Sequence, residues 1–513
     1  MPPATPPAAQ TSQSVPPPPF PVSPPESRKQ KLVTSTTFGP ATVRFARRST
    51  RGMMLGFSAL RCTAIGLAAL TVLLGLLTGG GGGLVVSAPV WAALLATAFV
   101  TRKGQPLVEW IPSVLHWASR VSAKQTTYRA RVTVPRPAGT MALPGDAAPL
   151  RFYNDPDTAA CLLHDPHRQT LSAVLCVSHP AYVLLAPSDQ VNRVSNWGRV
   201  IASLAQTGTC SVLQILESTI PDPGTKVAQW YQDHATHRDD WSNAQYQALL
   251  AQSSFGSSTH RTTITVTLDM KKAAAAIRGA GRGVKGAAHV LRIDMSVLEH
   301  GLRAAALRLD GWLGEAQVAA MIRQAYDPTT ELDANSPGAK LVSAGPVALS
   351  EHWSYLHHDS GYSTVLWISE WPRIEVAPHF LHALIFAPDI RKSLSLLARP
   401  LGTVEALRAL RKEKTEAITD AGHKAKVGQV QDLSDVQEYN DLLKREQALI
   451  GGHADVEFSG FITVTASSEE ELTQAVALIE RSAGQSGCET RVLYGRQSQG
   501  FVVGALPLGR GVF

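Results

Sequence analysis

Two groups of histidines are the first residues in this chain whose types suggest chemistry. Imidazole and carboxylate side chains are the ligands that zinc and similar ions use in proteins. Neither group contains an HExxH pattern or has a second ligand set at a recognisable distance, and adjacent histidines do not easily face one ion. We therefore expect packing or surface histidines and assign no metal-binding residues. The groups are His352, His357 and His358 with Asp359, and His164 and His167 around Asp165-Pro166.

The segment 279–286 (GAGRGVKG) is the closest approach to a phosphate-binding loop. A P-loop has the pattern GxxxxGK[ST], in which the lysine reaches the phosphates and the hydroxyl holds Mg²⁺. Here Lys285 stands before the last glycine, and no serine or threonine follows it. We expect a flexible basic loop. Contact with nucleic acid through Arg278, Arg282 and Lys285 is the alternative.

No other motif supports catalysis. There is no GxSxG elbow, and the cysteines are odd in number and form no CxxC pair, which fits a reducing compartment. Tyr362, Trp367 and Trp371 have the types that stack on bases, but aromatic residues interleaved in a strand favour core packing. The sequence thus predicts a protein that is not an enzyme, with no catalytic residues, no cofactor-binding residues and no cofactor. The cysteines are Cys62, Cys161, Cys176, Cys210 and Cys488.

Two apolar stretches, 62–78 and 84–100, precede the large remainder of the chain and set where it lies. They contain no charged residue and flank five consecutive glycines, Gly79 to Gly83. Each stretch makes about 26 Å of helix, slightly less than a ~30 Å hydrocarbon core, so flanking residues must contribute. We expect a transmembrane hairpin over 62–100. A cleaved secretory signal and a buried helical pair in a soluble domain are the alternatives.

The distribution of basic residues orients this hairpin. Arginine and lysine are dense before the first stretch, reappear at Arg102 and Lys103, and are absent from the glycine loop. The positive-inside rule then places both chain ends, and the large body, in the cytoplasm at the inner (plasma) membrane. Much of the excess positive charge behind the net charge of +7 lies in the segment before the hairpin. Lipid headgroups explain it more simply than nucleic acid, because each Lys or Arg close to an anionic leaflet contributes ~1 kcal/mol of binding free energy.

Composition and periodicity divide the rest of the chain. The segment 109–119 carries Trp110, Ile111, Leu115 and Trp117, a pattern typical of an interfacial helix with aromatic residues at headgroup depth. Strand signals at 169–185, 210–220, 261–268, 363–370, 394–397, 457–466 and 491–494 alternate with helical periodicity, including a helix at 290–309. A charged helical run covers 404–450. The fold class is therefore α+β or α/β, with two open-sheet units behind the hairpin and a long charged helical arm.

The expected divisions are a disordered Pro-rich tail (1–35), a basic juxtamembrane segment (36–61), the transmembrane hairpin (62–100), an interfacial helix and linker (101–149), a first cytoplasmic α/β unit (150–335), and a second unit that includes the arm (336–513).

Several segments resemble an actinobacterial family of membrane proteins that is encoded with conjugative type IV secretion components. They are FGPATVRFARRSTRG before the hairpin, AYDP, GPVALSEHWSYLHHD and WISEWPR in the middle, and VEFSGFITVTASSEEELTQAVALIE and YGRQSQGFVVGALPLG near the end. In that family the hairpin is similar to the small inner-membrane subunit of type IV secretion systems. The body resembles the amino-terminal, non-motor domain of the large conjugation ATPase.

The resemblance implies an inner-membrane scaffold that anchors a separate cytoplasmic P-loop ATPase and contacts other secretion subunits and lipids, as a homo- or hetero-oligomer. The resemblance implies an architecture for this chain but no catalytic site. Two alternatives remain open. The first is the E-type membrane component of type VII secretion, and the second is a membrane-tethered nucleic-acid-binding protein that uses the basic loop.

Overall fold

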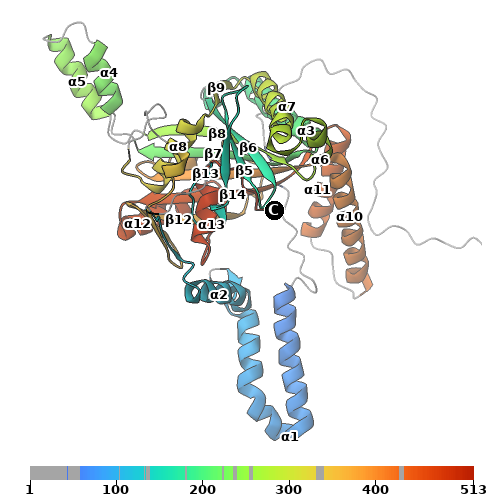
Figure 1. The fold of residues 1–513 in the computed structure, drawn as a ribbon. Helices are drawn as coiled ribbons and strands as arrows, with labels where there is room; N and C mark the ends of the chain where they lie inside the picture. Colours follow the sequence, from blue (N-terminus) through green and yellow to red (C-terminus); the bar gives the residue numbers. More distant parts are fainter. Residues whose placement is uncertain are drawn as a thin grey trace, which may run out of the picture. The chain divides into compact units, whose positions relative to one another are not determined.

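The structure is a computed structural model, and it describes residues 43, 45, 58–102, 104–131, 133, 139–178, 182–221, 225–234, 240–253, 258–330, 340–426 and 433–512. The chain has mixed α+β architecture with a large antiparallel sheet (Figure 1). The Pro-rich tail predicted at 1–35 lies outside the described residues, as does most of the basic segment 36–61.

The first long element is the apolar helix α1, Ala59–Phe99. Its course is interrupted at Gly80, whose φ of 55° and ψ of −135° are not helical. A left-handed φ of this kind is accessible to glycine at little steric cost, so the run of glycines supplies the break. Two short strands, β1 (Thr101–Arg102) and β2 (Gln105–Pro106), then lead into the amphipathic helix α2 (Leu107–Ser122).

A first βαββαβ repeat follows. Its strands are β6 (Thr170–Ser178), β7 (Cys210–Pro221), β8 (Ser258–Asp269) and β9 (Arg308–Trp312). Helix α3 (Pro187–Thr207) connects the first pair, and α6 (Ala274–Gly279) with α7 (Gly283–Ala304) connects the second. The strands lie side by side in the order β7-β8-β6-β9. This connectivity is the ferredoxin-like arrangement.

A second repeat has the same connectivity. Its strands are β12 (Gly361–Glu370), β13 (Arg391–Leu401), β14 (Asp455–Ala466) and β15 (Glu489–Val492). Helix α9 (His382–Ile385) stands in the first connection and α12 (Glu469–Gln485) in the second. The spatial order is β13-β14-β12-β15, the equivalent of the first repeat. The chain is therefore an internal duplication of one supersecondary unit.

The two repeats share one sheet, so the prediction of two separate open sheets is wrong. Strand β13 pairs antiparallel with β7, from Lys392 opposite Thr219 to Ala398 opposite Leu213. Two exposed strand edges are thereby removed, which avoids unpaired backbone groups. With the added strands β3 (Thr127–Arg129), β4 (Arg151–Asn154), β5 (Cys161–Asp165), β10 (Ala348–Glu351) and β11 (Leu356–His358), the sheet has 13 strands.

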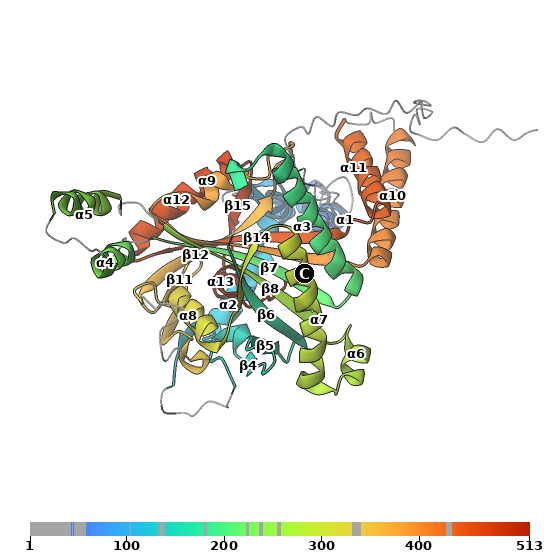
Figure 2. The same cartoon turned by 90° about the horizontal axis from the view of Figure 1, so that it is seen from above.

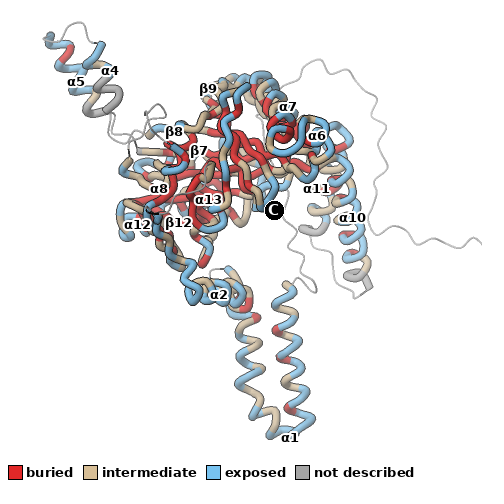
Figure 3. Tube along the Cα trace, viewed as in Figure 1, coloured by how far each residue is buried: buried red, intermediate tan, exposed pale blue. Residues whose placement is uncertain are grey.

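Helices cover both faces of this sheet (Figure 2). On one face α3 and α7 bury the apolar side chains of the first repeat, and α9 and α12 bury those of the second. On the other face lie α8 (Glu315–Tyr326), α13 (Gln497–Gly504) and the short 3₁₀ helices Gly145–Ala147 and Leu341–Ser343. The buried residues concentrate along the strands between these two layers (Figure 3). We call this sheet with its covering helices the body.

The end of the chain is fixed to the second face by polar side chains of the sheet. Gln214 donates to the carbonyls of Val503 and Leu506, and its own carbonyl accepts from the Gly509 amide at 2.7 Å. The hydroxyls of Thr265 and Thr267 donate to carbonyls further along the same segment. These bonds satisfy backbone groups that helix α13 and the following turn would otherwise bury without partners.

Both repeats carry a pair of helices between their second and third strands. In the first repeat these are α4 (Thr225–His234) and α5 (Trp241–Ser253). In the second they are α10 (Thr403–Lys426) and α11 (Leu433–Ile450), which are the predicted charged arm. Residues Val404–Gly452 form a compact unit of their own. Ion pairs between Lys414 and Glu446 (2.8 Å) and between Arg445 and Glu413 (3.0 Å) join the two helices of the arm.

Two local predictions fail. The helix expected at 290–309 begins earlier and ends at Ala304, because the chain turns at Ala305 and enters strand β9. The strand signals expected over 169–185 correspond to β6 only as far as Ser178, and the described residues after it form a 3₁₀ turn, Tyr182–Leu184, that leads into α3.

Candidate membrane anchor and its attachment to the body

Helix α1 is the only element of the described chain that is long and apolar enough to cross a membrane. Its leucine and valine side chains are largely exposed, with Leu77 at 74%, Val85 at 70% and Val86 at 82%. A row of apolar side chains without protein partners is expected where the surrounding medium is hydrocarbon.

The parts of α1 before and after Gly80 approach each other closely (Figure 1). A Cβ added at Gly75 would lie 2.6 Å from the Ser87 hydroxyl and 3.0 Å from the Gly83 carbonyl oxygen. Near the other end, Ala64 and Ala98 are buried in one cluster. Small residues at such contacts let helical backbones pack closely.

A polar junction connects α1 to α2. Ser58 caps the first turn of α1, and its hydroxyl donates to the Glu109 carboxylate at 2.8 Å. Arg61 lies 3.8 Å from the same carboxylate. Glu109 stands in the first turn of α2, where a negative charge is also stabilised by the helix dipole. The start of α1 is therefore tied to the start of α2.

Helix α2 is attached to the body by a buried ion pair. Arg120 in its last turn makes two bonds to the Glu351 carboxylate, at 2.6 and 3.3 Å, and also donates to the Gly495 carbonyl. The Glu351 side chain is 1% exposed and accepts in addition from the Ser498 amide. A paired, fully hydrogen-bonded carboxylate is stable at this depth, whereas an unpaired one is strongly disfavoured.

Aromatic rings surround this ion pair. The Trp110 ring lies 5.2 Å from Tyr494, and the Trp117 ring lies 5.8 Å from Trp353, measured between centroids. Trp353 and Tyr494 stack on each other. Both α2 tryptophans therefore pack against the body, where ring pairs of this kind are stabilising. Their position at lipid headgroup depth stays a prediction.

An adjoining side of α2 carries an exposed apolar stripe. Ile111, Val114 and Leu115 are exposed, and Val121 continues the stripe two turns on. This spacing of three and four residues marks one face of a helix. Helix α2 thus contacts the body through its tryptophans and Arg120 and leaves the apolar side chains of the adjoining side largely exposed.

The segment before α1 also contacts the body. Val43 and Val376 exchange two backbone hydrogen bonds, of 2.8 and 3.0 Å. The Phe45 ring stacks on Trp371 at 5.1 Å and meets Phe380 at 5.2 Å. The body is therefore held on both sides of α1, by this segment and by α2.

The histidines of the first group separate in the structure. His357 stacks on Tyr362, and His352 stacks on Tyr355. His358 points to the other side of strand β11, where it is 1% exposed. Its Nδ1 lies 2.6 Å from the Tyr326 carbonyl and its Nε2 lies 2.7 Å from the Ser363 hydroxyl. Burial lowers the pKa of His358 to about 4, so the ring is neutral.

In the group of His164, Asp165 and His167, the Asp165 carboxylate is the residue that holds the local structure together. Asp165 accepts from the amides of His167 and Arg168 and pairs with Arg510 at 3.0 Å. Burial is the main cause that lowers the pKa of His164. Within the described residues, no three His, Cys, Asp or Glu side chains come together in a way that suits a metal ion.

The basic loop forms the turn between α6 and α7. Arg278, Arg282 and Lys285 are exposed there, while Gly286 packs against Ile277. Burial raises the pKa of the Cys161 and Cys210 thiols to about 12, so neither is a thiolate at neutral pH.

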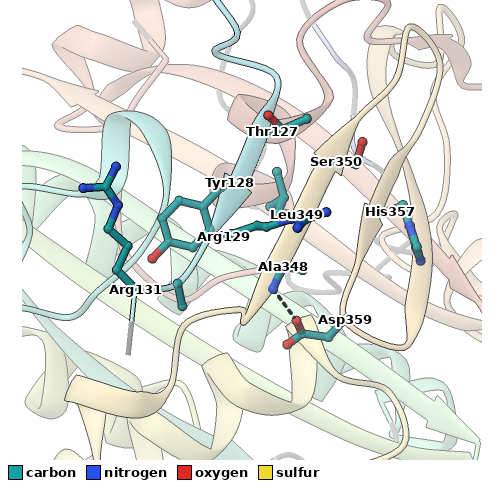
Figure 4. A pocket seen from close by; sticks show the side chains of 10 residues that line it. Thr127, Tyr128, Arg129, Arg131, Ala348, Leu349, Ser350, His357 and Asp359 are labelled. Atoms are coloured by element: carbon teal, nitrogen blue, oxygen red, sulfur yellow. Dashed lines mark hydrogen bonds between the residues drawn. The ribbon is translucent and has the colours of Figure 1, made fainter. Parts of the chain in front are cut away.

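A large hollow of about 930 Å³ borders the strands β3, β10 and β11 (Figure 4). Its polar side chains do not converge, since Arg131 and His357 lie on opposite sides of the view. Asp359 is already engaged with the Ala348 amide at 2.9 Å and with Arg323 at 2.8 Å. The hollow therefore holds no arrangement of groups that suggests a reaction.

Sequence reasoning missed the residues that attach α2 to the body. Arg120 and Glu351 are 231 positions apart, and neither belongs to a recognisable motif. The one available signal was the position of Arg120, the only arginine or lysine of this helix, in its last turn.

Comparison with protein-family models finds no match, and comparison with curated protein sequences finds none.

Proposed function

We propose that this chain is an inner-membrane scaffold of a type IV secretion or conjugation apparatus, and that it anchors a separate cytoplasmic P-loop ATPase. The observation that carries the proposal is the double attachment of the body, through Val43 and Phe45 before α1 and through Arg120 after it. A body held on both sides of an apolar helix moves with that helix. This is the property that a scaffold needs.

In this proposal α1 crosses the membrane twice. The break at Gly80 and the close approach of Gly75 to Gly83 support a reversal of the chain at the glycine loop. The basic residues Arg61 and Arg102 stand outside the two apolar stretches, and the loop has none. Both chain ends and the body then lie in the cytoplasm. The exposed stripe of α2 lies against the bilayer surface beside α1.

The body and the arm supply contact surfaces in this proposal, and the partner supplies the motor. The described residues that most resemble a phosphate-binding loop form an exposed helical turn, with no hydroxyl after Lys285 to hold Mg²⁺. The arm presents both charged side chains and exposed apolar ones, including Val404 and Ile450. Mixed surfaces of this kind suit association between subunits.

Crosslinking in intact cells, followed by purification and mass spectrometry, tests the proposal. The affinity tag belongs at the amino terminus, because the carboxy-terminal segment is fixed against the sheet as far as Gly509 and Arg510. A variant that lacks the arm tests its role. Leu401 pairs with Asp455 across the base of the arm, so a short turn can replace α10 and α11.

The matched control removes the other helical pair. Pro221 pairs with Ser258 across the base of α4 and α5, so the same replacement is available there. We expect a conjugation-type ATPase to be recovered with the intact chain and with the control, and several-fold less of it without the arm. Recovery of type VII components, or of no ATPase with the intact chain, contradicts the proposal.

A further inference from the structure

A small cavity lies on the second face of the sheet, near the line where β7 of one repeat pairs with β13 of the other. Its volume is about 50 Å³, and its wall includes Arg261 of β8 and Arg391 of β13. About 10–15 Å³ of such space accommodates one water molecule. The cavity therefore has room for a group of several heavy atoms.

The strand register directs polar groups from four strands to this cavity. Ser218 of β7 stands directly opposite Arg261 on one side and Ser393 on the other. Arg391 is two residues from Ser393, so both side chains leave the same face of β13. Thr465 stands opposite Arg391 on β14. All five residues line the cavity.

The positive charge at this cavity has no carboxylate partner among the described residues. The Arg391 guanidinium donates to the Gln324 carbonyl at 3.0 Å, and burial lowers its pKa. Asp327 acts on Arg391 electrostatically, but its carboxylate is paired with Arg323 at 2.7 Å. A partly buried cation without an ion pair is destabilising, and an anion that enters the cavity relieves that cost.

We propose that this cavity binds a phosphate group, held between the guanidinium groups of Arg261 and Arg391. Guanidinium groups bind phosphate oxygens with paired, charge-assisted hydrogen bonds. The Ser218 hydroxyl also lines the cavity, where it can donate to another oxygen of a tetrahedral anion. The site joins strands of both repeats, so its occupant also links the two halves of the body.

The proposal is independent of the scaffold function, and either can fail without the other. It is tested on the full chain purified in detergent, by titration calorimetry at constant ionic strength. One arm of the experiment uses inorganic phosphate and the other uses ADP. Binding in the first arm identifies the free ion as a sufficient ligand, and binding of ADP alone identifies a nucleotide as the source of the phosphate group.

Three variants make the result specific. We expect Arg391→Gln and Arg261→Gln to weaken binding at least about tenfold, the effect of losing a charge-assisted hydrogen bond. Arg399→Gln is the matched control, because Arg399 is on the same strand but pairs with Glu457 at 3.3 Å, away from the cavity. It should bind as the wild type does.

Thermal unfolding without ligand shows whether each variant is folded. We expect Arg391→Gln to unfold at or above the wild-type temperature, since it removes a charge that has no carboxylate partner. Two results overturn the proposal. One is the absence of binding in both arms. The other is binding that is unchanged in a folded Arg391→Gln variant.

Discussion

At the scale of single residues, a few buried polar groups decide how α2 and the body are joined. Arg120 and Glu351 illustrate this, because each compensates the charge of the other, and either charge buried alone would destabilise the fold. Asp327 is similar. Burial by itself raises its pKa, but hydrogen bonds from Ser360, Thr329, Thr330 and Arg323 together hold the pKa well below its usual range. Ion pairs and hydrogen bonds between residues far apart in the chain produce no periodic pattern in the sequence.

Replacement of Arg120 by alanine should loosen the attachment of α2. It leaves the Glu351 carboxylate buried without its partner, which typically costs about 3–5 kcal/mol. Thermal or urea unfolding in detergent measures the effect. The control is Arg303→Ala, which removes an exposed partner of Glu299 within one helix and should cost no more than about 0.5 kcal/mol. Equal effects for the two variants would contradict the structural role of Arg120.

The stability of the body should fall in mild acid because of His358. Its pKa is about 4 in the folded chain and about 6.5 when unfolded, so the unfolded state binds the extra proton first as the pH decreases. Between pH 6.5 and pH 5 this contributes a loss of about 2 kcal/mol. Urea unfolding at the two pH values measures it. A His358→Gln variant should lose less stability than the wild type over this interval, and an equal loss would refute the assignment.

At the scale of elements, the alternation of side chains in the sequence located strands correctly but did not show on which faces they are buried. The alternating segment at 261–268 is strand β8, as predicted. Such alternation usually indicates a half-buried strand. Here Ile264 and Val266 are buried on one face, and Thr265 and Thr267 are buried on the other. The threonines tolerate burial because the carboxy-terminal segment, more than 240 residues away, accepts their hydrogen bonds.

The close packing of the two parts of α1 should depend on the small residue Gly75. In Gly75→Leu the new side chain meets Ser87 and the Gly83 backbone, so the two parts of α1 cannot pack as they do in the wild type. Cysteines introduced at Ala64 and Ala98, in a chain without Cys62, should form a crosslink that this substitution abolishes. Gly79→Leu is the control, because nothing lies within 4 Å of a Cβ there. A crosslink that persists in Gly75→Leu would show that the parts are not packed through Gly75.

At the scale of the whole molecule, the duplication organises the chain. The sequence patterns located most strands of both repeats, including β7, β13 and β14, within a few residues. They did not reveal that β7 and β13 pair, because strand edges carry no side-chain signal for their partner. Nor did they reveal the candidate phosphate site, since Arg261 and Arg391 are brought together only by that pairing. The recognition of a secretion scaffold stays a prediction.

Removal of residues 505–513 should destabilise the whole body. It removes the carbonyls that accept from Thr265 and Thr267 and one of those that accept from Gln214, and each buried group left unsatisfied costs about 1–3 kcal/mol. Protease resistance of the purified chain is the measurement. Removal of residues 1–35 is the control and should have little effect. A truncated chain that resists protease as the wild type does would show that the carboxy-terminal segment is dispensable.

The most direct test concerns the claim that α1 is a two-span hairpin with the body in the cytoplasm. In a chain in which Cys62 and Cys176 are serines, single cysteines are introduced at Gly81 and at the exposed Arg303. The three other cysteines are buried. Intact cells are treated with a membrane-impermeant maleimide, and lysed cells provide the control for reactivity. The account predicts that Gly81→Cys is labelled in intact cells and that Arg303→Cys is labelled only after lysis. Labelling of Arg303→Cys in intact cells, or protection of Gly81→Cys until lysis, would contradict it.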